Sequence, residues 1–390
     1  MSPMLHVAGL GPAGRILAHR AAAHGWSVTA FDPTGGSLPS TIGVWADQMP
    51  DWAPANFLAS RFAPRIVLYD GTERALSHLY GIVDPQVFGS LSGFAVEESQ
   101  YPSSHRDEAT TDLVVVNATN SGPHLPIRQI AYGQVFPASA IPLEHRVPVL
   151  MDFRSVGEAE ADDTSVATFS YRLPLGDGTW LIEETILAVQ ITDSVTGTAC
   201  EGLVRSNQKH RLARLGIDAT MAVDEEYVNF PLGPARIPMH LSVLHTVATR
   251  LPSWAKPRTQ REPAQRFGSG GGWMHPATGY SVGQVLSDAD AALALLRAGK
   301  HLTPPGGWLL AHIRRRGLAA LLSFSPEQLR YFFTAFFSLP EEDIYTYLAG
   351  GRERFVVMRT LEVMAKIAVP LGKKSPSTLW RLIVSFLWGL

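Results

Sequence analysis

Three glycines near the N-terminus, in the spacing Gly9-x-Gly11-x-x-Gly14, constrain the fold more than any other feature of this sequence. They follow a short apolar run at residues 4–8 and open an alanine-rich stretch that Gly25 is placed to cap. A second apolar run follows at residues 26–31. This order predicts a strand, a tight turn, a helix and a second strand, which together begin a Rossmann-type α/β domain.

A turn of this kind predicts a dinucleotide site. The first glycine makes the turn, the second lets the backbone approach a pyrophosphate, and the third packs the helix on the sheet. The helix N-terminus adds N–H groups and a positive dipole, and an acidic residue at the end of the second strand can accept hydrogen bonds from a ribose. The predicted cofactor-binding residues of this segment are Gly9, Leu10, Gly11, Pro12, Ala13, Gly14 and Asp32.

The motif alone does not separate FAD from NAD, and a coincidental glycine turn is the simplest alternative. The strand, the helix and Asp32 stand in the expected order, which argues against coincidence. Pro12-Ala13 inside the turn is typical of FAD-binding reductases and hydroxylases. The sequence therefore favours FAD.

A second glycine-rich segment spans residues 266–280. Glycine lets the backbone come close to a ligand, and Pro276 suits the first turn of a following helix. We expect a second helix N-terminus aimed at a flavin. The alternative is a plain glycine loop before a surface helix, with His275 as a structural histidine. The predicted cofactor-binding residues here are Gly272, Met274, His275, Pro276, Thr278 and Gly279.

Two adjacent carboxylates, Glu183 and Glu184, lie inside the apolar run from Trp180 to Leu187. Burying ionised carboxylates is unfavourable unless they are paired, so a protein that keeps them there uses them or raises their pKa. Neighbouring side chains of a strand point to opposite faces, so one glutamate can enter a pocket while the other braces it from behind. The alternative is an edge strand with both groups in water. Glu183 and Glu184 are the candidate catalytic residues.

Composition narrows the classes of partner. Of 390 residues, 46% are hydrophobic and 17% charged, which is lean in charge for a freely soluble protein. The net charge of −2 and the lack of a basic, aromatic-rich tract argue against nucleic acid. We expect no metal site and no signal peptide. We also expect no transmembrane helix, since no apolar run reaches the roughly 18–20 residues that span a bilayer. The single cysteine, Cys200, suits a reducing compartment.

The chain changes character along its length. Strand-like runs fill the middle, Thr249 to Pro263 is a predicted loop, and helical periodicity follows Asp288. The predicted helix breaks are at Pro304-Pro305, Pro326, Pro340 and Pro370. We predict a discontinuous Rossmann-type FAD-binding domain (1–125 and 255–300), a β-rich substrate-binding region (126–254) and a helical C-terminal lobe (301–390).

Several of these segments resemble those of the lycopene cyclases, flavoproteins that close the end rings of carotenoids. The resemblances keep the family's order over most of the chain. One departure is Phe230-Pro231-Leu232-Gly233, where the family has Ile-Pro-Met-Gly-Gly and Pro234 replaces the second glycine. The matching segments are residues 9–14, 32–33, 42–47, 128–133, 151–154, 181–185, 272–280 and, in the helical end, 333–337.

The resemblance implies an isomerase of the intramolecular lyase type, a lycopene beta-cyclase. An acid protonates the terminal double bond of a ψ end of lycopene, an internal alkene attacks the cation, and a base removes a proton to leave a β-ionone ring. The product is γ-carotene or β-carotene. Glu183 would be the acid or cation stabiliser and Glu184 its partner or base, beside a reduced FAD that NAD(P)H reduces. An apolar pocket would keep the acid neutral.

Two other functions share parts of this pattern. An FAD-dependent monooxygenase or a prenyl (geranylgeranyl) reductase would use the same fold, but its usual Gly-Asp element is missing, because Trp273 follows Gly271-Gly272. A flavin-carrying membrane adaptor would not need the carboxylate pair in an apolar strand.

The C-terminal end suits a membrane surface, and a carotenoid substrate has to come from a bilayer. From Gly350 onward, seven lysines and arginines stand against two glutamates among many apolar and aromatic residues. A basic amphipathic end of this kind docks on anionic lipid, and the alternative is ordinary packing into the core. We expect a peripheral protein at the cytoplasmic face of a membrane.

Overall fold

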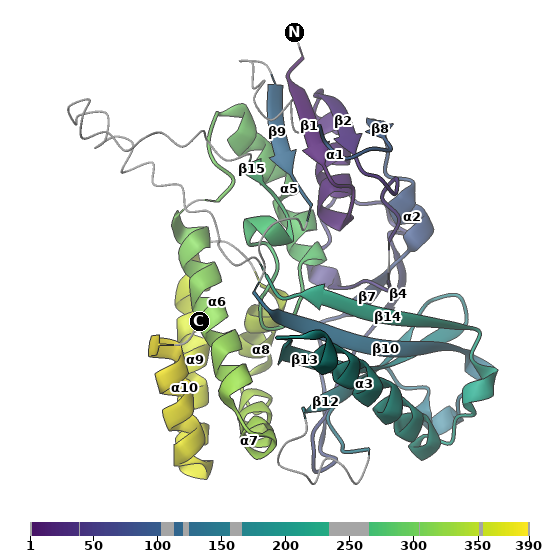
Figure 1. Ribbon diagram of the computed structural model, residues 1–390, viewed down its shortest axis with the longest axis vertical. Coiled ribbons are helices and arrows are strands. Elements are labelled where there is room, and N and C mark those ends of the chain that lie inside the picture. Colours follow the sequence, from purple (N-terminus) through teal and green to yellow (C-terminus); the bar gives the residue numbers. More distant parts are fainter. Residues whose placement is uncertain are drawn as a thin grey trace.

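A computed structural model describes residues 2–38, 40–102, 113–119, 125–156, 166–233, 265–303, 305–350 and 354–388. The chain has an α/β fold in which a parallel sheet, a larger mixed sheet and a group of C-terminal helices adjoin one another (Figure 1). The loop predicted from Thr249 to Pro263 lies outside the described residues.

The N-terminal strand, turn and helix form as the glycine spacing predicts. Strand β1 (Met4–Ala8) leads into α1 (Pro12–Ala23), and β2 (Ser27–Phe31) then pairs in parallel with β1. Gly25 follows α1 with a φ of +79°, a conformation that glycine adopts without strain at helix ends.

The parallel sheet combines segments that are far apart in the sequence. Among the described residues its order is β15-β9-β1-β2-β8, and every pair is parallel. Helix α5 packs against α1 beside it. The elements not yet given are β8 (Ala95–Glu97), β9 (Leu113–Asn117), β15 (Gln265–Arg266) and α5 (Val282–Arg297).

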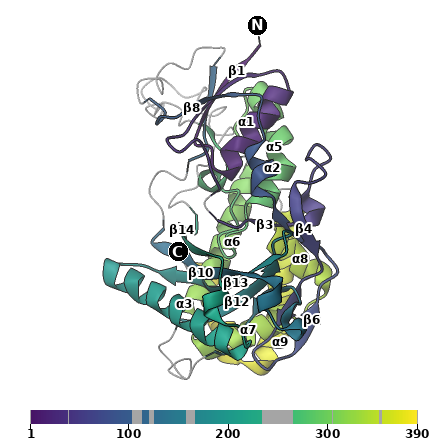
Figure 2. The same cartoon turned by 90° about the vertical axis from the view of Figure 1, so that its right-hand side faces the viewer.

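The mixed sheet forms the middle of the molecule. Within the described residues its order is β14-β10-β13-β12-β11-β5-β6, and α3 (Ser194–Arg214) covers one face (Figure 2). Its strands are β5 (Arg65–Val67), β6 (Glu73–Ala75), β10 (Ile127–Pro137), β11 (Val149–Asp152), β12 (Thr168–Pro174), β13 (Thr179–Gln190) and β14 (Asp224–Pro231).

Strands β5 and β6 belong to the segment that the sequence assigned to the FAD-binding domain, yet they extend the mixed sheet. Such short strands carry no local pattern that says which sheet they join. A third, antiparallel sheet has the order β3-β7-β4, and α2 follows β7. These elements are β3 (Gly43–Trp45), β4 (Leu58–Phe62), β7 (Tyr80–Val83) and α2 (Pro85–Gly89).

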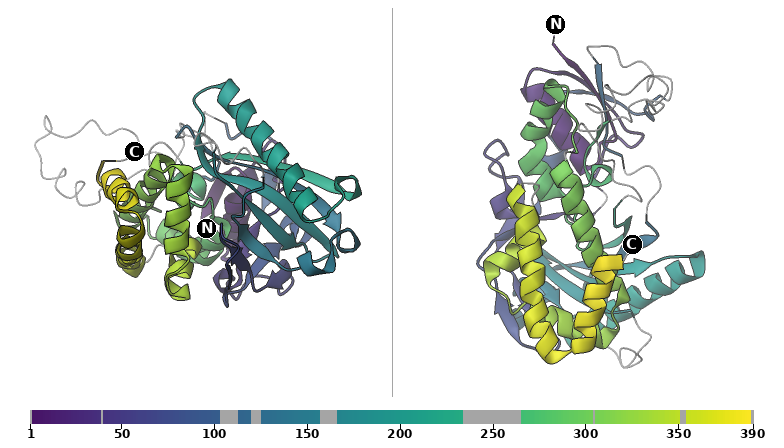
Figure 3. Two further views of the ribbon diagram at one scale, coloured as in Figure 1. Left: turned by 90° about the horizontal axis from the view of Figure 1, so that it is seen from below. Right: turned by 90° about the vertical axis from the view of Figure 1, so that its left-hand side faces the viewer.

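The C-terminal lobe is helical, as predicted. Figure 3 shows α9 and α10 on the outside of this group, and both pack against α6. No helix among the described residues is long and apolar enough to cross a bilayer. The helices are α6 (Pro305–Ser323), α7 (Pro326–Phe336), α8 (Glu341–Ala349), α9 (Arg354–Lys374) and α10 (Pro376–Trp388).

Prolines mark most of the helix boundaries. Pro305 and Pro326 open helices and Pro340 precedes α8, but Pro370 lies inside α9, so the break predicted there is wrong. Ile367 and Leu371, close to Pro370 on either side, are fully buried. Their packing continues the helix across a proline that costs about 3 kcal/mol in a helix interior.

Candidate active site

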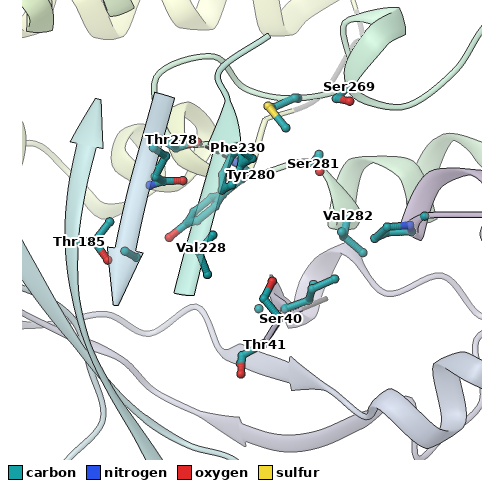
Figure 4. A pocket seen from close by; sticks show the side chains of 18 of the residues that line it. Ser40, Thr41, Thr185, Val228, Phe230, Ser269, Thr278, Tyr280, Ser281 and Val282 are labelled. Atoms are coloured by element: carbon teal, nitrogen blue, oxygen red, sulfur yellow. Dashed lines mark hydrogen bonds between the residues drawn. The ribbon is translucent and has the colours of Figure 1, made fainter. Parts of the chain in front are cut away.

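A cavity of about 430 Å³ lies between the carboxyl edge of the parallel sheet and one face of the mixed sheet. Its walls come from the β1–α1 turn, the loop after β15, the start of α5 and strands β10, β12, β13 and β14. In Figure 4, Thr185, Val228 and Phe230 approach from the strands, while Ser281 and Val282 approach from the start of α5. Both glycine-rich segments and the Glu183 strand therefore meet at one cavity.

The first glycine turn forms one end of the cavity, where Gly11, Pro12 and Ala13 line it. A Cβ added at Gly11 would meet no atom within 4 Å, so this side of the turn is open to a ligand. A Cβ added at Gly14 would lie 1.8 Å from the Gly9 carbonyl oxygen. The second glycine thus leaves room for a ligand and the third permits close packing, as the motif predicts.

Asp32 holds the turn from behind the cavity wall. Its carboxylate accepts hydrogen bonds from the backbone N–H groups of Leu10 and Thr34, each 2.8 Å long. Partial burial opposes ionisation, but these bonds and the Thr34 hydroxyl hold the pKa of Asp32 below its usual value. The carboxylate stays ionised and, with more than two lone pairs, is able to accept a ribose hydroxyl as well.

The second glycine-rich segment reaches the same cavity, although not through every predicted residue. Gly272, His275 and Pro276 lie outside its wall. The residues of this segment that line the cavity are Gly268, Ser269, Met274, Thr278, Gly279 and Tyr280.

His275 serves the structure of this segment. Its ring is buried against Tyr347, and burial with the nearby Arg314 charge lowers its pKa well below the usual value. The helix expected at Pro276 is absent, because residues 276–278 form a turn and α5 begins at Val282. Gly279 follows that turn with a φ of +76°, outside the helical region, so the prediction of a helix there is wrong. The start of α5 faces the cavity instead.

The two adjacent glutamates point to opposite faces of β13. Glu183 lines the cavity and is 7% exposed, whereas Glu184 is fully buried beneath α3. Arg211 Nε lies 3.1 Å from Glu184 Oε2, and the Thr168 hydroxyl donates to Oε1 at 2.5 Å. Glu184 is thus held in an ion pair on the far face, where it cannot act on a ligand in the cavity. Of the two adjacent glutamates, Glu183 is the one that faces the cavity.

The surroundings of Glu183 favour its neutral form. One contact acts the other way: the Thr185 hydroxyl donates to Oε1 at 3.1 Å and lowers the pKa of Glu183. Burial, reinforced by the neighbouring Glu226 carboxyl, raises the pKa of Glu183 well above its usual value. A carboxylic acid whose neutral form is favoured in this way is suited to donate a proton.

Glu226, on β14, is a site residue that the sequence did not predict. It lines the cavity, lies within hydrogen-bonding reach of Glu183, and accepts a 2.8 Å hydrogen bond from the Thr41 backbone N–H. The sequence shows only three acidic residues in a row, Asp224, Glu225 and Glu226. Which of them faces inward depends on the register of β14, and no local pattern gives that register.

Three tyrosines were also missed. Tyr80 from β7, Tyr171 from β12 and Tyr280 line the cavity, and the Tyr80 and Tyr280 rings lie 6.1 Å apart. Burial raises the pKa of Tyr280 to about 12, so its hydroxyl stays neutral. Neutral aromatic rings attract a cation placed over their faces within about 6 Å. Tyr280 ends the second glycine-rich segment, but nothing in the sequence placed it beside the other two.

The chain matches known proteins over most of its length. A lycopene beta cyclase of Synechococcus elongatus is 26% identical over 88% of this chain and 88% of its own length. An uncharacterized carotenoid cyclase of Deinococcus radiodurans is 27% identical over 94% of this chain and 92% of its own length. Among solved structures, 2-methyl-3-hydroxypyridine-5-carboxylic acid oxygenase is 13% identical, with a TM-score of 0.48 over 89% of this chain and 95% of its own.

The family match is broad. Residues 106–356, more than half of the chain, match the family model described as lycopene cyclase protein. This span contains the Glu183 strand, Glu226 and the whole second glycine-rich segment. The chain belongs to the lycopene cyclase family.

Proposed function

We propose that this protein is a lycopene cyclase, an isomerase of the intramolecular lyase class that closes the ψ ends of lycopene into β-ionone rings. One closure gives γ-carotene and two give β-carotene. One observation carries the proposal: a buried glutamic acid with a raised pKa, Glu183, faces a cavity that continues to a dinucleotide turn.

Glu183 begins the reaction by giving its proton to the terminal carbon–carbon double bond of a ψ end, which leaves a tertiary carbocation. The neighbouring internal double bond attacks that carbon, forms the new ring bond and moves the positive charge into the ring. Loss of a ring proton to a carboxylate restores a double bond, so no electrons or protons are consumed overall. A positioned acid of this kind contributes about 10²–10⁴-fold to the rate.

The cavity walls suit a carbocation. Leu173, Leu181 and Val228 present apolar surface that keeps out water, which would otherwise trap the cation as an alcohol. The tyrosine rings add a cation–π attraction of about 0.5–2 kcal/mol each where a face is presented.

The residues at the first turn fit FAD. The open side of Gly11 and the start of α1 suit a pyrophosphate, and the ionised Asp32 suits a ribose. A reduced flavin bound there would supply an electron-rich ring system that stabilises positive charge. We include NAD(P)H in the proposal as the reductant of that flavin.

We also propose that the protein takes lycopene from a bilayer, as a peripheral protein at the cytoplasmic face. Helices α9 and α10 support this, because large apolar and basic side chains are exposed on the same pair of helices. The exposed apolar residues are Met358, Leu361, Val369, Trp380, Ile383 and Leu387. The exposed basic residues are Arg359, Lys373, Lys374 and Arg381.

Expression in a lycopene-accumulating host, followed by pigment analysis, tests the function. The wild-type protein should convert lycopene into cyclic carotenoids. Glu183→Gln should keep its flavin and lose at least about 10²-fold in activity, because the proton donor is gone. Glu144→Gln, an exposed carboxylate away from the cavity, is the matched control and should keep full activity. Unchanged lycopene despite folded, flavin-loaded wild-type protein would refute the proposal.

A further inference from the structure

We propose that Glu226 is the proton partner of Glu183, so that the two carboxyl groups share one proton and exchange it during each ring closure. This inference rests on the proposed function. It assigns to Glu226 the role of partner or base that the family resemblance implied for Glu184.

The sheet register brings the two carboxyl groups together. Gly133 on β10 stands opposite Glu183 on β13 and, on its other side, opposite Glu226 on β14. A Cβ added at Gly133 would lie 3.0 Å from the Glu183 Cβ. The same Cβ would lie 2.7 Å from Leu181 Cδ1, so any other residue at Gly133 would crowd Leu181 and Glu183 on the cavity face of the strand that separates the two glutamates.

The two acids differ in their access to water. Glu183 is buried, while Glu226 is half-buried near the β14 edge of the sheet, beside the Thr41 backbone N–H. Glu226 is thus placed to accept a proton from the ring and to exchange it with solvent when the cavity is empty.

The other titratable groups around Glu183 do not take over this role. Tyr171 faces it from β12, and Tyr80 and Tyr280 approach from β7 and the loop before α5. Burial raises the pKa of each of these tyrosines, so they remain neutral. Glu184, on the opposite face, is paired with Arg211.

The proton balance closes within the pair. Glu183 gives its proton to the terminal carbon of the substrate, and both carboxyl groups are then ionised beside the cation. Glu226 takes the proton released from the ring as the new double bond forms. That proton passes to Glu183 along their mutual hydrogen bond, which restores the starting state without any other acid, base or reductant.

The pH dependence of cyclisation tests the pair. Activity needs the proton on Glu183, so it should fall as the pH rises through the raised pKa of Glu183. Glu226→Gln removes the negative charge that helps to hold this proton, so the falling limb should move down by about one pH unit or more. Because the base is also lost, kcat should fall much more than KM changes.

A matched control lies next along the same strand. Glu225 points away from the cavity and accepts a 2.6 Å hydrogen bond from the Tyr132 hydroxyl, so Glu225→Gln should keep the wild-type profile. Glu226→Asp should recover part of the lost rate, since it restores a carboxylate. A Glu226→Gln profile that superimposes on the wild-type profile would overturn the proposal.

Infrared difference spectroscopy of the FAD-loaded protein needs no turnover. The wild type at neutral pH should show the C=O band of a neutral carboxylic acid. Glu183→Gln should remove this band, and Glu226→Gln should make it titrate at lower pH. If this pattern occurs in a protein that leaves lycopene unchanged, the pair stands and the proposed function fails. If lycopene is cyclised but Glu226→Gln leaves the band's titration unchanged, the pair alone is refuted.

Discussion

At the scale of single residues, glycines shape this site as much as the glutamates do. Gly11 leaves one end of the cavity open, Gly14 permits contact with the Gly9 carbonyl, and Gly133 leaves room for the Leu181 and Glu183 side chains of the neighbouring strand. These glycines have different neighbours, so their substitution should affect different properties.

Gly11→Val should abolish FAD binding and leave the fold intact, because the new side chain meets no protein atom and occupies the space of the ligand. Gly11 has a φ of −58°, which valine adopts without strain. Gly14→Val is the contrasting variant and should destabilise the protein by about 1–3 kcal/mol or more through overpacking. Flavin absorbance and thermal unfolding of the purified proteins separate the two effects. A yellow Gly11→Val protein with a full complement of FAD would contradict the assignment of this turn.

At the scale of elements, local patterns were readable from the sequence and long-range register was not. The strand, turn and helix from Met4 to Ala23 follow from apolar runs and glycine spacing. The opposite faces of Glu183 and Glu184 follow from strand geometry alone. Glu226 and the tyrosines depend on how β14, β7 and the loop before α5 are placed against β13, which only distant pairing decides. The same limit applies to Pro276, where turn geometry overrode a helix-start signal.

Helix α3 is held on the mixed sheet by a buried ion pair that gives a stability prediction. Arg211 is 2% exposed and forms an ion pair with Glu184. Its Nη1 atom also lies 3.6 Å from Asp152 Oδ1. Arg211→Met should lower the free energy of unfolding by about 3–5 kcal/mol, because it removes the guanidinium charge that balances the buried Glu184 carboxylate.

Denaturant unfolding monitored by circular dichroism checks this value. Lys209→Met, exposed on the same helix, should change stability by no more than about 0.5 kcal/mol. Equal stability of the two variants would show that the ion pair does not hold α3.

At the scale of the whole molecule, the proposed reaction needs a route from lipid to cavity. The exposed apolar residues of α9 and α10 lie on the outer helices of the C-terminal lobe, beside basic side chains. In our proposal, the membrane is a surface on which the protein rests, and the C-terminal lobe orients the cavity relative to it.

The double variant Trp380→Ser/Leu387→Ser should bind vesicles that contain anionic phospholipid at least about tenfold more weakly than the wild type. Losing two large apolar side chains removes more than the ~1.4 kcal/mol that a tenfold change requires. Leu143→Ser/Val195→Ser, at residues that are 75% and 77% exposed elsewhere, is the control and should bind as the wild type does. Co-sedimentation with the vesicles measures binding of the wild type and the two variants. Equal binding of all three proteins would refute the proposal that α9 and α10 bind the membrane.

The path of the chain between its sheets has a consequence for how the protein is made. Strands β5 and β6 join the mixed sheet through β11, which is synthesised later. Likewise, β15 and α5, which complete the parallel sheet and pack against α1, leave the ribosome long after β1 and α1. No single cut in the polypeptide separates the two sheets into complete fragments. The nascent chain thus carries an unfinished flavin pocket through most of its synthesis, and cofactor loading belongs to the last stage of folding.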